Sequence, residues 1–136
     1  MNKIGVDTNI FVYALDNSSI YHSICDTFLK DTENELFTTA KNLSEFVAVC
    51  TKIGIGQYEM KGFYDEIKNN ITILYPNEET LKVFEQLIDK YQPKGNRVYD
   101  IEIVSIFISN NINKLATINT DDFKNITEIN LFEFKK

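Results

Sequence analysis

The chain has 136 residues, of which 43% are hydrophobic and 25% are charged. These values are typical of globular proteins and predict a single domain over residues 1–136. The 20 acidic and 14 basic residues give a formal net charge of −6, which argues against a broad basic surface that would grip nucleic acid. No segment approaches the roughly 20 apolar residues of a membrane-spanning helix. We therefore expect a cytoplasmic protein with no membrane partner.

The cysteine and histidine content limits the kinds of metal site. The chain has two cysteines, Cys25 and Cys50, and one histidine, His22. Both cysteines fit apolar helical stripes and are expected to be inert thiols of the core. Without clustered cysteine or histidine, a zinc site of the Cys/His kind is excluded. Any metal must then have oxygen ligands, which favours Mg²⁺ or Mn²⁺.

Apolar patterns predict alternating strands and helices. In chain order we expect a strand at 3–7, helices at 8–14 and 20–29, a strand at 35–39, helices at 39–51 and 57–68, a strand at 71–74, helices at 81–88 and 98–111, and a strand at 114–117. A weak fifth strand is predicted within 128–134. This alternation predicts a parallel α/β sheet, in which ligands bind outside the carboxyl ends of the strands.

Carboxylates lie at or near these strand ends. Asp7 closes the first strand, and Asp121 and Asp122 follow the fourth. Glu45 lies in the first turns of the helix after the second strand, and Asp100 opens the helix before the fourth. Carboxylates brought together raise one another's pKa unless divalent ions neutralise them. The pattern therefore favours a metal site.

Each acid also has a purely structural explanation. Asp7 or Asn9 would cap the first helix, and residues 42–45 match a capping box. Asp100 would complement a helix dipole, and residues 121–122 would form a solvated turn. Taken singly, these explanations are the simpler ones, so the case for a site depends on the whole set of acids.

Four segments together resemble the PIN-domain nucleases, and in particular the VapC-type toxin ribonucleases of bacterial toxin–antitoxin pairs. They are residues 6–14 (VDTNIFVYA), 42–46 (NLSEF), Gly95 with 99–104 (YDIEIV), and 115–123 (LATINTDDF). The segments follow the family's order and spacing along the whole chain. The resemblance implies a three-layer α/β/α fold with a four- to five-stranded parallel sheet in the order 3-2-1-4-5.

Position by position, the resemblance implies an acidic quartet made by Asp7, Glu45, Asp100 and Asp122. These residues would hold one or two Mg²⁺ or Mn²⁺ ions and would be the catalytic residues. Asp121 is an additional acid that competes with Asp122 for the fourth position.

Two further groups of residues surround the quartet. The resemblance implies that the first group orients ligands or water: Thr8, Asn9, Thr117 and Asn119. The second group consists of basic residues that flank the acids and are candidates for contacts with RNA phosphates: Lys41, Lys94 and Arg97.

The resemblance implies that the protein is a metal-dependent endoribonuclease in which water attacks the phosphodiester directly. It would be the toxin of a type II toxin–antitoxin system, with a VapB-like antitoxin as its partner, and a homodimer. Two alternatives stay open, namely a PIN-like binding module with weak or no catalysis and a housekeeping nuclease that processes RNA or DNA. A phosphoacceptor receiver domain is disfavoured because residues 71–75 offer no Asp at the end of the third strand.

The protein partners need an apolar contact surface. We expect it on the early helices and the segment after the Gly54/Gly56 pair, with ordinary core packing as the alternative for about half of the residues. The residues are Phe11, Tyr13, Ile20, Tyr21 and the range 57–64.

Overall fold

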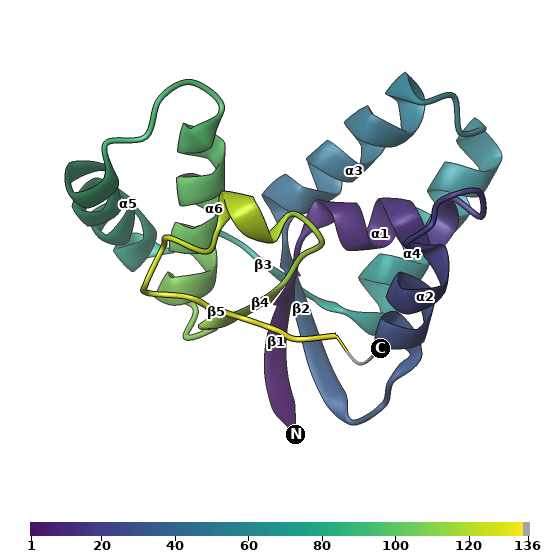
Figure 1. Cartoon of the computed structure of the whole chain (residues 1–136), viewed down its shortest axis with the longest axis horizontal. Helices are drawn as coiled ribbons and strands as arrows, with labels where there is room; N and C mark the ends of the chain where they lie inside the picture. Colours follow the sequence, from purple (N-terminus) through teal and green to yellow (C-terminus); the bar gives the residue numbers. More distant parts are fainter. Residues whose placement is uncertain (135–136) are drawn as a thin grey trace.

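The computed structural model describes residues 1–134 and shows a parallel β-sheet between two layers of helices (Figure 1). The strands are β1 Asn2–Val6, β2 Asn34–Thr39, β3 Thr72–Leu74, β4 Lys114–Ala116 and β5 Asn130–Leu131. Their order in the sheet is β3-β2-β1-β4-β5, and every neighbouring pair is parallel. The predicted fold class and strand order are therefore confirmed.

The helices divide between the two faces of the sheet. They are α1 Thr8–Leu15, α2 His22–Lys30, α3 Ala40–Lys52, α4 Gln57–Asn70, α5 Glu78–Tyr91 and α6 Arg97–Ser109, with a 3₁₀ turn η1 at Thr120–Asp122. Helices α1 to α4 cover one face, and α5 and α6 cover the other (Figure 1). In the described residues, no helix is long and apolar enough to cross a membrane.

Several element boundaries differ from the predicted ones by one to three residues. The expected capping box at 42–45 is wrong, because Thr39 is the N-cap of α3 and its box partner is Asn42. Helix α6 starts at Arg97 rather than at residue 98. The weak fifth strand forms only two residues, Asn130–Leu131.

The central strand β1 serves both faces of the sheet, because successive side chains point to opposite sides. Ile4 and Val6 are fully buried against the helices of the first layer. Gly5, between them, faces Phe107 of α6, and a Cβ added at Gly5 would lie 2.6 Å from its ring. The missing side chain lets an aromatic ring of α6 pack directly on the strand backbone.

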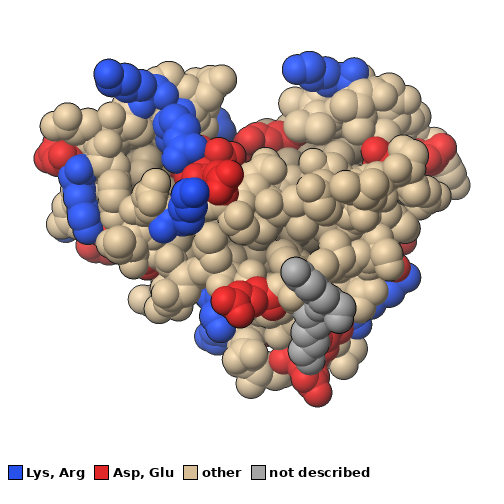
Figure 2. Space-filling model, viewed as in Figure 1, with Lys and Arg blue, Asp and Glu red and all other residues tan. Residues whose placement is uncertain are grey.

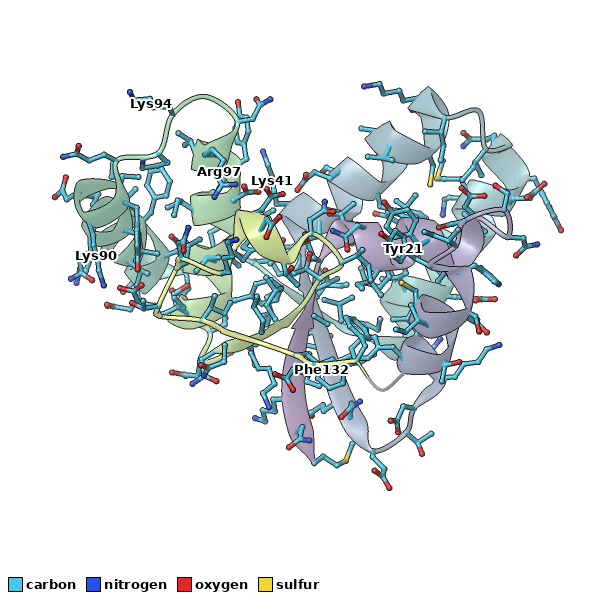
Figure 3. The ribbon with its side chains drawn as sticks, in the orientation of Figure 1. Tyr21, Lys41, Lys90, Lys94, Arg97 and Phe132 are labelled. Atoms are coloured by element: carbon cyan, nitrogen blue, oxygen red, sulfur yellow. The ribbon has the colours of Figure 1, made fainter. Side chains whose placement is uncertain are left out.

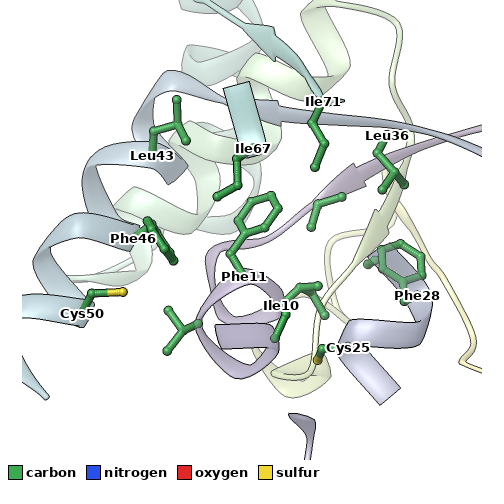
Figure 4. Packing of buried hydrophobic residues seen from close by; sticks show 14 of the residues in the cluster. Ile10, Phe11, Cys25, Phe28, Leu36, Leu43, Phe46, Cys50, Ile67 and Ile71 are labelled. Carbon is green, nitrogen blue, oxygen red and sulfur yellow. The ribbon is translucent and has the colours of Figure 1, made fainter. Parts of the chain in front are cut away.

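The first-layer core is built around aromatic residues (Figure 4). Phe11 of α1 meets Phe46 of α3 edge-on, with their ring centroids 6.3 Å apart. Phe11 is fully buried and Met60 is 3% exposed, so both belong to the core and not to the predicted contact surface. Cys25 and Cys50 are buried and free, as predicted.

Helix α6 is apolar around most of its circumference, which is typical of a helix enclosed on several sides. Ile101, Val104 and Phe107 are among its buried residues. It packs between the sheet and α5 (Figure 1). This burial fixes the first turn of α6 beside the carboxyl edge of the sheet.

Candidate active site

Asp7 stands at the point in the sheet where the order of the strands reverses. It follows β1 directly, and β1 lies between β2 and β4. Crevices at such a switch point are the usual ligand sites of open α/β sheets. Asp7 is also the N-cap of α1, since its Oδ1 accepts a hydrogen bond from the Thr8 backbone N–H at 2.9 Å. The capping and the site interpretations of Asp7 are thus compatible.

Hydrogen-bond donors hold the Asp7 carboxylate in one orientation. Its Oδ2 accepts from the Thr117 hydroxyl at 2.8 Å and from Asn9 Nδ2 at 3.1 Å. Asn9 Oδ1 also accepts from the backbone N–H of Ile118 at 3.1 Å, which ties α1 to the segment after β4. Among the described residues, Asn119 reaches this network only through its backbone N–H, which donates to Thr117 Oγ1 at 3.1 Å.

Asn42 belongs to the same network, although its place in the sequence predicts only a capping role. It is fully buried, and its Nδ2 donates to Thr8 Oγ1 at 2.9 Å and to Asp7 Oδ1 at 3.4 Å. Its Oδ1 accepts from the Thr39 hydroxyl at 2.7 Å. The spacing of Thr39 and Asn42 was the available signal, because a Thr cap with Asn three residues later places that amide at the start of a helix.

The four predicted acids line one cleft of about 490 Å³. They come from β1's end, α3, α6 and η1: Asp7, Glu45, Asp100 and Asp122. Asp121 does not line this cleft; its side chain is 88% exposed and pairs with Lys124 at 3.0 Å. The structure thus brings Asp122, and not Asp121, to the other three acids.

Burial and mutual repulsion raise the pKa of three of these carboxyl groups. Burial is the main cause at Asp7, where Asp122 adds to it and the Thr117 hydrogen bond opposes it. Burial followed by the nearby Asp7 raises the pKa of Glu45 to about 7. Burial followed by Asp122 raises the pKa of Asp100 to about 6, against the opposing effect of Arg97. The cleft therefore favours either bound protons or a bound cation.

The sequence model of the PIN domain family matches residues 4–129. The chain belongs to the PIN domain family. No curated protein sequence matches it.

Several solved toxin–antitoxin structures share the fold of this PIN domain. VapBC2 from Rickettsia felis, bound to a promoter DNA fragment, matches at 21% identity and a TM-score of 0.75, covering 98% of this chain and 99% of that chain. VapBC-1 from Haemophilus influenzae matches at 20% identity and a TM-score of 0.73, covering 96% of this chain and 97% of that chain. Mycobacterium tuberculosis VapC20, a toxin that cleaves the sarcin–ricin loop, matches at 11% identity and a TM-score of 0.72. The match covers 89% of this chain and 93% of that chain.

The oxygen donors of this PIN domain suit a hard divalent cation. Glu45 Oε1 is buried and has no hydrogen-bond partner among the described residues, so it can accept a ligand without giving up a contact. In residues 1–134, no three Asp, Glu, His or Cys side chains are placed to hold a metal ion as they stand. The donor set therefore fits such an ion by its chemistry.

The three predicted basic residues lie at different distances from the acids of the cleft. Arg97 donates to Asp122 Oδ1 at 2.9 Å, and Lys41 lies 3.5 Å from Glu102. Figure 3 labels Arg97 on α6, Lys41 beside it on the side of α3, and Lys94 at the loop before α6. In Figure 2, basic side chains stand beside the acidic patch in the notch of the surface. Arg97 thus contacts an acid of the cleft, and Lys41 is close enough to Glu45 to oppose the rise of its pKa.

The raised pKa values predict that the metal-free PIN domain loses stability as the pH rises. The folded pKa of Glu45, about 7, exceeds its ordinary value of 4.5, so folding favours the protonated form and its contribution is lost as the pH rises through 7. We expect the thermal midpoint to fall between pH 5 and pH 8. Glu45→Gln should flatten this profile and be more stable than wild type at pH 8 by about 1–3 kcal/mol.

The measurement is a series of thermal melts with chelator present. Glu66→Gln, at an exposed position of α4, removes the same charge without touching the cleft and should follow the wild-type profile. Equal pH profiles for wild type and Glu45→Gln would contradict the electrostatic account of the cleft.

Proposed function

We propose that this PIN domain is a divalent-metal-dependent endoribonuclease and the toxin of a type II toxin–antitoxin pair. The observation that carries the proposal is the convergence of four carboxylates from four separate segments on one cleft at the carboxyl edge of the sheet. Such an arrangement is costly for folding, as the raised pKa values indicate. It is accounted for if the acids bind a cation.

Asp7, Glu45, Asp100 and Asp122 would hold Mg²⁺ or Mn²⁺. When bound at such a site, a divalent ion activates water and stabilises charge on the phosphoryl group. The Asp7 carboxylate has a fixed orientation among the four, because Thr117 and Asn9 donate hydrogen bonds to it. Glu45 and Asp100 release their protons as they become ligands. The chain has only His22 as a histidine, and it is absent from the cleft lining, so a histidine would not be the base in the attack by water.

The rim of the cleft offers contacts that suit single-stranded RNA. The Tyr99 side chain is half exposed, and Lys41 Nζ lies 4.8 Å from its ring centroid. Aromatic rings stack on unpaired bases, and lysine or arginine side chains contact phosphates. Arg97 stands nearby at the start of α6. The similar fold of VapC20, a toxin that cleaves an RNA loop, also supports RNA as the substrate.

A VapB-like antitoxin is the partner that the similar VapBC structures support. The exposed part of the predicted apolar surface includes Ile20, which is 88% exposed, and Tyr58, which is 92% exposed. Tyr21 is less exposed, at 39%, and packs on Tyr13 with ring centroids 5.0 Å apart. These side chains are the contacts that we propose for the antitoxin or for a second copy of the chain.

Metal removal tests the proposed activity. The purified protein should cleave single-stranded RNA with Mg²⁺ or Mn²⁺ and lose the activity in excess EDTA, because the ion supplies the activated water. Restoring Mn²⁺ should restore cleavage, and a DNA of the same sequence serves as the competing substrate. Expression without an antitoxin should arrest growth.

Each other outcome favours one of the alternatives. Metal binding without cleavage of either nucleic acid would favour a PIN-like binding module. Cleavage without growth arrest, or faster cleavage of DNA, would favour a housekeeping nuclease.

A further inference from the structure

Arg97 is bound to two acids of the cleft and to the backbone beside one of them. Its Nη1 lies 2.9 Å from Asp122 Oδ1 and 3.8 Å from Asp100 Oδ2. Its Nη2 donates to the Asp122 carbonyl oxygen at 2.7 Å. One guanidinium group therefore joins the first turn of α6 to η1, although the two residues lie 25 positions apart in the sequence.

This contact determines where a divalent ion can lie. An ion between Asp100 and Asp122 would share carboxylate oxygens with Nη1 and would stand next to a positive charge that arginine does not lose. On the opposite side the nearby cation is Lys41, but its Nζ lies 3.5 Å from Glu102, which does not line the cleft. There Glu45 Oε1 is buried without a partner among the described residues. The repulsion between the guanidinium group and a divalent ion that share the same carboxylate oxygens is strong in a partly buried site.

We propose that Arg97 acts as a built-in cation on the Asp100–Asp122 side, so that the four acids of the cleft hold a single divalent ion, which lies nearer to Asp7 and Glu45 than to Asp122. The inference rests on the proposed metal-dependent function and specifies its stoichiometry. Arg97 is a positioning residue in this account: it holds Asp122 in place and excludes a second ion. Asp122 is then the carboxylate that keeps the guanidinium beside the acids of the cleft.

A count of bound Mn²⁺ tests the proposal without using activity. Metal-free protein is titrated with Mn²⁺, and the free ion is measured by electron paramagnetic resonance. We expect one bound ion for wild type and two for Arg97→Gln, because the substitution removes the charge and frees the Asp122 carboxylate. Adding Asp122→Asn to Arg97→Gln should return the count to one.

Two variants separate this effect from a loss of charge anywhere on the surface. Lys94→Gln removes one positive charge from the exposed loop before α6 and should still bind one ion. Arg97→Lys keeps the charge at the cleft and should also bind one ion. The Arg97 side chain is 47% exposed, so its replacement opens no cavity in the core.

The outcomes distinguish this proposal from the proposed function. Two ions bound to wild type or to Arg97→Lys, or one ion bound to Arg97→Gln, would overturn the role of Arg97 and leave the metal-dependent function standing. Wild type that binds no Mn²⁺ would overturn the metal-dependent function, and the role of Arg97 with it.

Discussion

Asp100→Asn is expected to lower the rate of RNA cleavage by roughly 10²-fold or more, and Asp7→Asn by at least as much. Each substitution keeps the shape of the side chain but removes a negative charge from the cleft, which weakens ion binding and the stabilisation of the transition state. Initial rates on a labelled RNA with saturating Mn²⁺ would measure the effect. Wild-type rates in both variants would show that the acids are assigned wrongly.

Asp121 and Asp122 provide a matched pair for the same assay. Asp122 lines the cleft and is held by Arg97, while the neighbouring Phe123 is 2% exposed and anchors the turn in the core. Asp121 points to solvent and pairs with Lys124. Asp122→Ala should therefore impair cleavage clearly, and Asp121→Ala should stay near the wild-type rate. The opposite ranking would place the fourth acid at Asp121.

Gly5→Ala is expected to destabilise the fold by about 3 kcal/mol. The added Cβ would lie 2.6–2.9 Å from three ring atoms of Phe107, which is fully buried. Overpacking of this kind forces shifts of side chains and backbone. Denaturant unfolding followed by circular dichroism would measure the loss as a lower midpoint at an unchanged slope.

Gly62→Ala is the matched control for this stability measurement. Gly62 lies within α4, and nothing is within 4 Å of a Cβ added there. Alanine is the better helix former by about 1 kcal/mol, so the same change should stabilise the protein. Equal effects at Gly5 and Gly62 would contradict the close packing of Phe107 on β1.

Patterns within single elements made the fold predictable. The apolar run in α6 and the short β-branched run ending at Leu74 each mark one element. The acids at strand ends could also be predicted to meet, because parallel strands end at one edge of the sheet. Asp7 and Asp122 converge for this reason, although they are far apart in the sequence.

Contacts between distant segments could not be predicted in the same way. The sequence places Arg97 near Asp100, but only the path of η1 shows that its main partner is Asp122. Phe11 and Ile20 are both apolar residues of the early segments, yet one is fully buried and the other 88% exposed. Which side of a helix meets the sheet depends on tertiary packing. Asn42 was assigned to the wrong cap position for a similar reason, since Thr39 and Asn42 are both good caps.

Because several hydrogen bonds hold Asp7 in the fold, mutations at the different acids of the cleft should have different consequences under genetic selection. Asp7 caps α1 and accepts hydrogen bonds from Thr117 and Asn9, so its loss leaves buried donors unpaired, at a cost of about 1–3 kcal/mol each. Asp100 has no comparable set of donors; among the described residues its ion-pair partner is Arg97, at 3.8 Å. Among cells that survive expression of the chain, changes at Asp100 should leave a folded, accumulating protein. Changes at Asp7 should reduce its abundance as well.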